Sequence, residues 1–502
     1  MVPFYNEIRE RGLSDILRRK EYQTPLFENT PVVREALKNI IKKNARVLVY
    51  GDYDIDGLMC ALVVSQGLKL LGVTAVDVYQ YQQRTHNLDN LAVQKCVQGK
   101  YDYFIICDTG SNDMSSLKLL QSYGVSVLVL DHHNTMHSYK DFQENGVAII
   151  NTTLEKQEFC LSAGALCFCV LDDVAKCFDC DLGNIVAFAA VSLFSDCMDM
   201  KAPLNRAIYY KSAEIPREEL PVCLKMFMTD YMSFNARFIN YWFAPRINAM
   251  FRSEFFEPIN LLFLVNGADY ALRGKCIEII NKTYESNREL VSKVTDIISV
   301  NQLNNFVIGD LQSVDKYYNV HENKLYNHTG LVANKLSERY SKPAIVYCKH
   351  DLGYKGSVRD IFGRDFLSIF SQLCFAGGHS AAFGIKIKAL DLEDFLCDLH
   401  RIDNTVSMDS VKNEPIIIDY IYQQPDETLI EDMALFNEFA GQTIPVVLLR
   451  KQIVGAIRNV YSEYYYKYRW GSYDIQSNFA LGFGRKVLLK PIHSWCTKLL
   501  VQ

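Results

Sequence analysis

Short apolar runs separated by helix-length segments dominate the first third of the chain. The runs are rich in β-branched residues: RVLVY at 46–50, AVDVYQY at 75–81, YFIIC at 103–107, VSVLVL at 125–130 and VAII at 147–150. Continuous apolar strands that alternate with helices are typical of a parallel sheet covered on both faces. We expect the functional residues of such a sheet at the ends of its strands.

The pattern changes along the rest of the chain. Residues 161–305 are mainly helical in pattern and end in a long helix that includes Ile277 and Ile298. A second alternation of strands and helices follows, with strands expected at 306–310, 343–348 and 383–387. The polar segment 403–415 is expected to be a linker, and the remainder is predicted to be β-rich.

These patterns predict an α/β protein in which a parallel-sheet core lobe is joined by a long helix to a smaller α/β lobe and a β-rich C-terminal module. The expected parts are an N-terminal helical segment 1–44, a core domain 45–265, a connecting helix 266–304, a second domain 305–402 and a C-terminal module 403–502.

Composition limits the class of protein. The 502 residues are 49% hydrophobic and 22% charged, as in folded proteins of two or three domains. Apolar stretches are too short for a membrane helix and the N-terminus lacks a signal-peptide core, so we expect a cytoplasmic protein with no membrane association. The fifteen cysteines are then expected to be reduced thiols. A net charge of −5 argues against coating nucleic acid by bulk attraction.

Three aspartates follow the first apolar strand at alternate positions. Asp52, Asp54 and Asp56 lie in the sequence GDYDIDG. Crowded carboxylates repel one another unless a cation holds them, so the spacing indicates a hard metal such as Mg²⁺ or Mn²⁺. An EF-hand loop begins similarly, but it needs a preceding helix and a glutamate at the twelfth position, where this chain has Val63. A solvated acidic turn is the remaining alternative.

Further ligand-type residues follow three other apolar runs. Asp108 ends the third predicted strand, and Asp131, His132 and His133 end the fourth in the sequence LDHHN. Asp196 follows the apolar run of VSLFSDCMDM. Each has an ordinary explanation alone, such as a satisfied histidine pair. Together they supply enough carboxylate and imidazole for a two-metal site.

The motifs GDYDIDG, CDTG, LDHH and FSDCMD, in this order, resemble those of the DHH phosphoesterase superfamily. KGSVRD at 355–360 and FAGGHSAAFGI at 375–385 resemble the substrate-binding motifs of the DHH-associated domain. Three segments resemble the branch of RecJ-like single-stranded-DNA exonucleases: SAGAL at 162–166, APLNRA at 202–207 and APRINAM at 244–250. The resemblance implies that 45–265 is the DHH catalytic domain and 305–402 the DHH-associated domain.

The resemblance also implies a site for two divalent cations, Mn²⁺ or Mg²⁺. The implied metal ligands are Asp54, Asp56, Asp108, His132 and Asp196, with Asp56 and Asp108 bridging the ions. Asp52 would support this cluster and Asp131 would orient the histidine loop. His133 would face the scissile phosphate, where an imidazole can stabilise charge or move a proton.

Substrate contacts are implied mainly in the second lobe. Ser357 and Arg359 would hold a phosphate, and Gly377 and Gly378 would let the backbone approach the nucleotide, with His379 on a phosphate. Outside this context a Gly-Gly-His triplet is more often a turn. Arg246 and Asn248 are expected to line the same groove. RecJ relatives usually carry a Gly-Tyr-Gly element where this chain has QQRTHNLDN at 82–90, in which Arg84 and His86 are candidates for DNA contact.

Basic and aromatic residues interleave near the C-terminus. Residues 441–502 contain nine lysines and arginines against two acidic residues, together with many tyrosines and tryptophans. This combination suits single-stranded nucleic acid, because cations follow the backbone and rings stack on bases. An oligonucleotide-binding (OB) barrel is the form expected from the resemblance, and an aromatic core strand with solvated lysines is the alternative.

The cysteines around 160–180 raise the question of zinc. Cys177 and Cys180 have the spacing of half a zinc site, but the surrounding apolar pattern is helical. We therefore expect buried thiols that act as small hydrophobic side chains.

The resulting expectation is a metal-dependent exonuclease that hydrolyses single-stranded DNA, 5′ to 3′ by family analogy, and releases 5′-mononucleotides in DNA repair, recombination or replication. It is expected to be a monomer, with a helicase or single-strand-binding protein as candidate partner. The alternatives are a short-oligonucleotide (nanoRNase-type) or nucleotide phosphatase, and a catalytically silent replication scaffold, which would tend to lose the metal ligands present here.

Overall fold

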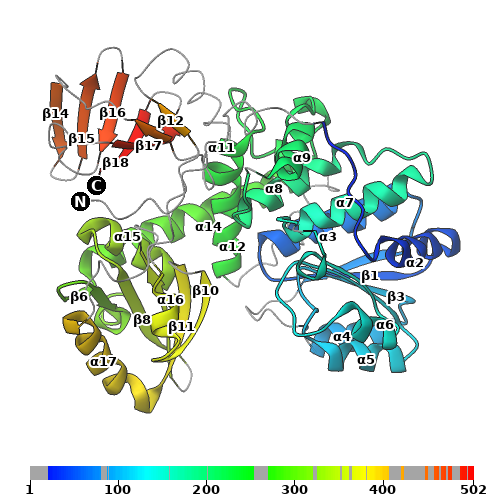
Figure 1. Ribbon diagram of the computed structural model, residues 1–502, viewed down its shortest axis with the longest axis horizontal. Helices are drawn as coiled ribbons and strands as arrows, with labels where there is room; N and C mark the ends of the chain where they lie inside the picture. Colours follow the sequence, from blue (N-terminus) through cyan, green and yellow to red (C-terminus); the bar gives the residue numbers. More distant parts are fainter. Residues whose placement is uncertain are drawn as a thin grey trace. The chain divides into compact units, whose positions relative to one another are not determined.

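The computed structural model describes most of the chain (Figure 1). The described residues are 21–80, 88, 90–157, 159–200, 202–253, 270–319, 325–350, 353–360, 365–379 and 382–405, and the backbone of the C-terminal strands within 420–501. Contacts divide them into two units. The first unit consists of the described residues before Asn281 together with the C-terminal strands, and the second runs from Asn281 to the end of the described 382–405 segment. Each part is described by itself.

A five-stranded parallel sheet forms the centre of the first unit, and it confirms the strands predicted from the apolar runs. The strands are β1 (Val47–Gly51), β2 (Val76–Gln80), β3 (Tyr103–Cys107), β4 (Ser126–Asp131) and β5 (Ala148–Asn151), in the order β2-β1-β3-β4-β5. Because all five run the same way, their carboxyl ends meet at one edge of the sheet, where the predicted ligand residues lie.

Both faces of this sheet are buried, which explains why its strands are apolar at successive positions. Val47 and Val49 pack into one hydrophobic cluster, and Leu48 and Tyr50 pack into another on the opposite face. Figure 1 shows that the first face is covered by helices that include α3 and α7, and the second by α4, α5 and α6. These helices are α3 (Ile55–Leu70), α4 (Asn90–Gln98), α5 (Met114–Ser122), α6 (Tyr139–Glu144) and α7 (Ala163–Lys176).

A helical layer continues from the first face of the sheet. It contains α2 (Thr30–Lys43), α8 (Val186–Ser195), α9 (Pro203–Ala213) and α12 (Ala244–Ser253), the last preceded by a π-helical turn, Ile239–Phe243. Helices α3, α7 and α8 pack against one another and are buried on nearly all sides. Their apolar character follows from this central position, since little of their surface is left to solvent.

The unit after Asn281 contains a six-stranded sheet. The order is β10-β11-β9-β8-β7-β6, with strands β6 (Ser299–Gln302), β7 (Val307–Asp310), β8 (Ala344–His350), β9 (Gly353–Arg359), β10 (Phe375–His379) and β11 (Ala382–Lys388). Helices α15 (Thr329–Tyr340), α16 (Leu367–Phe370) and α17 (Leu392–Thr405) accompany it. The predicted strands at 306–310, 343–348 and 383–387 are confirmed.

Long helices precede and follow this sheet. The predicted connecting helix is α14 (Tyr270–Ile297), and β6 begins directly after it. At the other end, α17 continues to Thr405, past the expected start of the linker at 403. The carboxylate of Asp403 explains this extension, because it accepts hydrogen bonds from the main-chain N–H groups of Asn304 and Asn305 at 2.9 and 2.6 Å. These bonds tie the last helical turn to the strand layer.

The C-terminal region contains a seven-stranded sheet, which confirms the predicted β-rich module. Its order is β12-β13-β17-β18-β16-β15-β14, formed by Tyr420–Tyr422, Val447–Leu449, Val487–His493, Cys496–Val501, Tyr473–Ser477, Tyr465–Trp470 and Ile457–Ser462. Strands β14, β15 and β16 form a meander, and β16 pairs in parallel with β18.

Among the described helices, none is both long and apolar enough to cross a membrane.

Candidate metal centre

The turn between β1 and α3 brings the first aspartates together. Asp54 is the N-cap of α3, and its Oδ1 accepts the main-chain N–H of Gly57 at 2.9 Å. A Cβ atom at Gly57 would lie 2.3 Å from the backbone of Asp52, so only glycine fits this turn. The tight turn places Asp52 at the strand end and Asp54 and Asp56 at the start of the helix.

Asp108, directly after β3, is almost fully buried. Its backbone has a left-handed φ of 63°, which is uncommon for a residue other than glycine. Among the described residues, neither of its carboxylate oxygens has a hydrogen-bond partner. Burial, followed by the negative charges of Asp56 and Asp54, raises the pKa of this carboxyl well above its ordinary value. A cation between these oxygens would remove the repulsion, so the residues present fit a metal ion.

Asp131, at the end of β4, fixes the loop that carries both histidines. Its Oδ1 accepts the main-chain N–H groups of His132 and His133 and the Nδ1–H of His133, at 2.8, 3.1 and 2.8 Å. Burial alone would raise the pKa of Asp131, but the hydrogen bond and charge of His133 lower it to about 2. Burial alone would lower the pKa of His133, whereas Asp131 raises it to about 9. The pair is therefore carboxylate and imidazolium at neutral pH.

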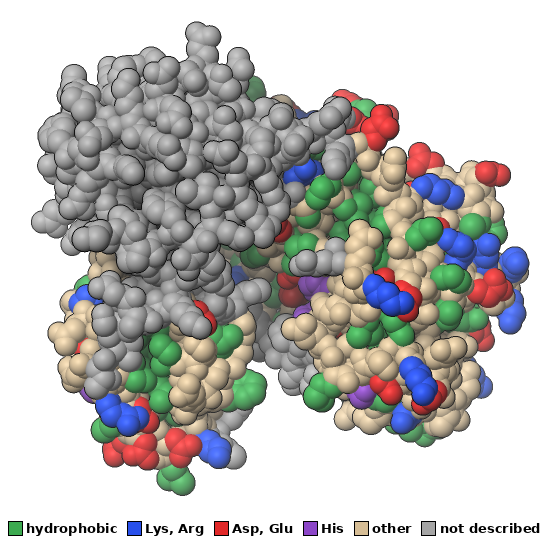
Figure 2. Space-filling view, viewed as in Figure 1, with side chains coloured by type: hydrophobic (Ala, Val, Ile, Leu, Met, Phe, Trp, Pro, Cys, Tyr) green, Lys and Arg blue, Asp and Glu red, His purple; other side chains and the backbone are tan. Residues whose placement is uncertain are grey.

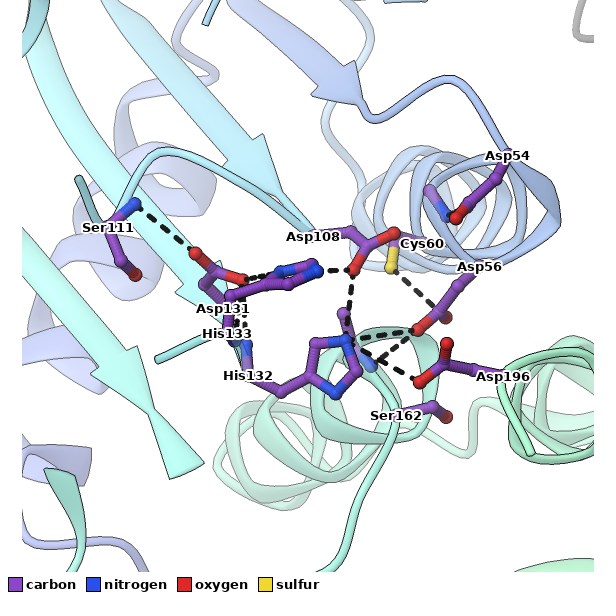
Figure 3. A network of polar contacts seen from close by, with 12 residues as sticks. Asp54, Asp56, Cys60, Asp108, Ser111, Asp131, His132, His133, Ser162 and Asp196 are labelled. Atoms are coloured by element: carbon purple, nitrogen blue, oxygen red, sulfur yellow. Dashed lines mark hydrogen bonds and ion pairs between the residues drawn. The ribbon is translucent and has the colours of Figure 1, made fainter. Parts of the chain in front are cut away.

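His132 points into the cluster of aspartates (Figure 3). Its Nε2 lies 3.2 Å from Asp108, 3.6 Å from Asp196 and 3.8 Å from Asp56, each measured to a carboxylate oxygen. On the other side of the ring, Nδ1 lies 3.1 Å from the carbonyl oxygen of Leu161. Because a carbonyl can only accept, Nδ1 carries the proton in this arrangement and Nε2 presents a lone pair to a metal.

Asp196 follows the last turn of α8, as the C-cap of that helix. Burial and then the charges of Asp56 and Asp54 raise its pKa to about 8. The side chain remains 28% exposed, compared with 2% for Asp108 and 44% for His133. The site is therefore closed on the Asp108 side and open on the side of His133 and Asp196. Figure 2 shows histidine and acidic side chains next to one another at the surface of this unit.

The structure thus brings all five predicted metal ligands together. Three overlapping groups have ligand atoms within 4.8 Å of one another: Asp108, His132 and His133; Asp56, His132 and Asp196; and Asp52, Asp54 and Asp108. Within the described residues, none of these groups includes a cysteine, and Cys167 and Cys169 are buried in α7 as expected from the apolar pattern. Cys177 is exposed and Cys180 half-buried, unlike the buried thiols expected there, because they lie beyond the end of α7.

Other residues that the sequence reasoning did not single out support the cluster. The side chain of Asn151, at the end of β5, donates hydrogen bonds to the Ser111 hydroxyl at 2.8 Å and to the His133 carbonyl at 2.9 Å. Ser111 in turn donates its main-chain N–H to Asp131 at 3.2 Å. Asn151 could have been found from its position, because it is the polar residue that follows the fifth apolar run. Ser192, whose hydroxyl donates to Asp56, could have been found as a hydroxyl within the apolar run of α8.

The predicted phosphate-binding residues of the second unit lie on β9 and β10, the two strands that flank β11 in its sheet. Gly377 pairs with Gly384, which pairs with Ser357, and His379 pairs with Ala382, which pairs with Arg359. The backbone at Gly378 has a φ of 137°, and a Cβ there would lie 2.9 Å from the backbone of Phe383. A residue other than glycine is therefore excluded at this position, in agreement with the predicted close approach of backbone.

Arg359 is largely enclosed by its own sheet and by the start of α15. One guanidinium nitrogen donates to the carbonyls of Val358 and Phe383 at 2.8 and 3.2 Å, and burial lowers its pKa. A Cβ at Gly330 would lie 2.7 Å from the other terminal nitrogen, and the Ser357 hydroxyl bonds that of Thr329 at 2.8 Å. Gly330 and Thr329 were not identified from the sequence.

The remaining predicted substrate residues lie elsewhere in the chain. Arg246 in α12 is 6% exposed, stacks 3.7 Å from the ring centre of Trp242 and donates to the Trp242 carbonyl at 2.8 Å. Asn248 lies on the same helix, and its carbonyl accepts a hydrogen bond from Arg252. Arg84 and His86 lie outside the described residues. Arg246 and Asn248 belong to the first unit, whereas Ser357 and Arg359 belong to the second.

The fold and this constellation of aspartates and histidines resemble those of a DHH domain. Residues 46–187 match the family model described as the DHH family, N-terminal domain.

Its relatives belong to the RecJ branch. The chain is 27% identical over 398 residues to the single-stranded-DNA-specific exonuclease RecJ of Bacillus subtilis, which covers 74% of this chain and 48% of that protein. It is 23% identical over 468 residues to the RecJ of Haemophilus influenzae, covering 82% and 77%. The chain thus spans about half the length of the first relative and about three quarters of the second.

Solved structures share the fold at lower identity. RecJ from Thermus thermophilus in complex with Mn²⁺ has a TM-score of 0.69 and 17% identity, covering 97% of this chain and 72% of that one. An exonuclease RecJ bound to manganese has a TM-score of 0.59 and 19% identity, covering 77% and 97%. The predicted fold class and the resemblance to RecJ are therefore confirmed.

Proposed function

We propose that the chain is a metal-dependent exonuclease that hydrolyses single-stranded DNA in the 5′ to 3′ direction, releases 5′-mononucleotides and acts in DNA repair, recombination or replication. The observation that carries the proposal is the buried carboxylate of Asp108, which faces His132 and the other acidic residues with no hydrogen bond to either oxygen among the described residues. The substrate is taken from the relatives, whose names describe single-stranded-DNA-specific exonucleases.

In this proposal Asp54, Asp56, Asp108, His132 and Asp196 hold two divalent cations, Mn²⁺ or Mg²⁺. Such a pair supplies an activated water and neutralises charge that develops on a phosphoryl group. His132 is oriented for this role by its bond to the Leu161 carbonyl. Asp52, in the β1–α3 turn, contributes negative charge next to Asp54 and Asp108.

His133 acts on the substrate side of the cluster. In the metal-free chain the carboxylate of Asp131 raises the pKa of His133 to about 9 against the effect of burial, which favours the protonated ring. An imidazolium can donate a hydrogen bond to a phosphate oxygen, stabilise its charge and deliver a proton to the leaving oxygen. Its exposure of 44% allows a phosphodiester to reach it.

The second unit holds the strand that is cleaved. Ser357 and Arg359 bind a phosphate, the backbone at Gly377 and Gly378 approaches the nucleotide, and His379 contacts a phosphate. Arg246, Asn248 and Arg84 contribute further contacts. The C-terminal sheet binds single-stranded DNA, and the protein works as a cytoplasmic monomer with a helicase or a single-strand-binding protein as partner.

The test is Mn²⁺-dependent digestion of a long single-stranded DNA labelled at either end, with a dinucleotide in parallel and EDTA as control. Immediate release of labelled 5′-mononucleotide from the 5′-labelled strand is expected. Immediate release from the 3′-labelled strand instead would refute the direction. Cleavage of the dinucleotide alone would favour a short-oligonucleotide phosphodiesterase, and no cleavage of either would favour a silent scaffold.

A further inference from the structure

The carboxylate of Asp56 takes the place of a capping side chain at the start of α7. Its Oδ2 accepts the main-chain N–H of Ala163, and its Oδ1 accepts that of Gly164, both at 2.9 Å. These are the first two amides of the helix, which have no carbonyl partner within it. Ser162 stands at the N-cap position, yet its own hydroxyl makes no capping bond to the helix.

Two serine hydroxyls lie next to Asp56, whose Oδ1 is also 3.8 Å from the Cys60 thiol. Ser192, on α8, donates its hydroxyl proton to Oδ1 of Asp56, and the hydroxyl of Ser162 bonds that of Ser192. Because a hydroxyl has a single proton and Ser192 gives it to the carboxylate, Ser162 must donate to Ser192. Both serines are fully buried, so the chain from Ser162 through Ser192 to Asp56 is shielded from water.

Gly164 is required by the closeness of these groups. A Cβ atom there would lie 2.5 Å from the Ser192 hydroxyl and 3.2 Å from Oδ1 of Asp56. The first distance is shorter than any real contact, so a side chain would displace either the serine or the carboxylate. The glycine therefore permits three donors from two helices to converge on one carboxylate.

We propose that Ser192 and the Ala163–Gly164 amides are positioning groups for metal binding, because they hold Asp56 in one orientation toward His132 and Asp196. The proposal rests on the proposed metal centre. Oδ1 of Asp56 accepts hydrogen bonds from Gly164 and Ser192, and Oδ2 accepts one from Ala163, which fixes the carboxylate plane and leaves one lone pair of Oδ2 for a cation. Oδ2 of Asp56 lies 3.8 Å from Nε2 of His132, on the side that faces the cluster.

Fixing the orientation of Asp56 before a metal arrives should strengthen metal binding. A carboxylate free to rotate at this position would have to be ordered when a metal binds, and fixed outer ligands remove that cost. Replacing a group that orients a metal ligand typically weakens metal binding about 10-fold to 100-fold. We therefore expect Ser192→Ala to weaken Mn²⁺ binding about 10-fold and Gly164→Ala, which displaces Ser192 or the carboxylate, about 100-fold.

The experiment compares the full-length chain with Ser192→Ala, Gly164→Ala and the control Ser65→Ala. Ser65 is also a fully buried serine and lies on the same helix as Asp56, but its hydroxyl donates to the Leu62 carbonyl at 3.5 Å. Free Mn²⁺ is measured by electron paramagnetic resonance during titration, and circular dichroism reports folding. Exonuclease rate is then measured as a function of Mn²⁺ concentration.

The expected result for Ser192→Ala is a higher Mn²⁺ dissociation constant and a matching shift of the Mn²⁺ concentration for half-maximal rate, while Ser65→Ala behaves as the unaltered chain. A lower melting temperature with unchanged Mn²⁺ affinity would make Ser192 a packing residue and overturn the inference. If the unaltered chain binds no Mn²⁺, the metal centre itself is wrong and the inference falls with it. Normal binding by the unaltered chain and equal binding by Ser192→Ala would refute the inference alone.

Discussion

Nδ1 of His133 lies 2.8 Å from Oδ1 of Asp131, and the same oxygen accepts the main-chain N–H groups of both histidines. One carboxylate thereby sets the shape of the loop and the charge of the ring. The consequence is a histidine that keeps its proton at neutral pH next to a cluster of acidic residues that binds cations. The two residues are neighbours in sequence, but their pairing depends on the loop that Asn151 and Ser111 support.

Asp131→Asn should lower the pKa of His133 from about 9 toward the ordinary histidine range near 6.5, because an amide lacks the negative charge that stabilises imidazolium. The ring would then be largely neutral at pH 7.5. Nuclear magnetic resonance titration of the ring protons in EDTA measures this shift, with His133→Gln to assign the signal. An unchanged midpoint would show that Asp131 does not set the charge of His133.

Asp108→Asn should abolish metal binding while preserving the fold. Asparagine tolerates the left-handed backbone found at Asp108, whereas alanine does not. Burial and the neighbouring aspartates oppose ionisation of Asp108, a cost that the neutral amide avoids, so the metal-free variant should melt several degrees higher than the unaltered chain. Differential scanning calorimetry with EDTA and then with Mn²⁺ checks both statements. Stabilisation by Mn²⁺ equal to that of the unaltered chain would exclude Asp108 as a ligand.

Stability of the metal-free chain should fall as pH rises from roughly 4 to 8. In the folded state the pKa of Asp196 is about 8, whereas its ordinary value is 3.8, so the folded chain binds more protons than the unfolded chain throughout this window. Mn²⁺ replaces those protons, and its stabilising effect should therefore be larger at pH 8 than at pH 6. Melting temperatures in EDTA and in Mn²⁺ at both pH values provide the measurement.

The matched variant for this pH dependence is Asp196→Asn, which cannot take up the proton. Its melting temperature in EDTA should vary less with pH than that of the unaltered chain. Equal pH dependence of the two proteins would mean that Asp196 titrates near its ordinary value.

Gly57→Ala should prevent the β1–α3 turn from closing. The added Cβ would lie 2.3 Å from the backbone of Asp52, with no flexible side chain to move aside. We expect a loss of more than ~3 kcal/mol in the free energy of unfolding, or insoluble protein. Gly274→Ala is the control, because this exposed glycine of α14 has open space around its Cβ and should gain about 0.5 to 1 kcal/mol. Urea denaturation compares the two variants.

Arg359→Lys should weaken substrate binding more than it slows the chemical step. Lysine keeps the charge but loses the planar fork of donors that matches a phosphate. We expect KM for single-stranded DNA to rise roughly 10-fold with a smaller change in kcat. Arg339→Lys is the control, since Arg339 pairs with Asp296 on the surface. Equal kinetics for both variants would remove Arg359 from the substrate site.

The parallel sheet and its ligand-bearing edge could be predicted from the sequence because both depend on local pattern. Buried parallel strands are apolar at every position, and a polar residue directly after such a run must lie at the strand end. This reasoning found Asp52, Asp108, Asp131 and the two histidines. The spacing of Asp54 and Asp56 added the first turn of the following helix.

The tertiary structure decided which groups support the ligands and where the predicted substrate residues lie. The bonds of Asp56 to Gly164 and Ser192, and of His132 to the Leu161 carbonyl, join segments far apart in the chain, so no local pattern encodes them. The stacking of Arg246 on Trp242, four residues before it, was also not predicted from the sequence. The sequence determined which residue types reach the sheet edge, because each buried strand is a short apolar run and the polar residue after it must lie at the strand end. The packing of α7 and α8 determined how the ligand side chains are oriented, because hydrogen bonds between helices form only once those helices are in place.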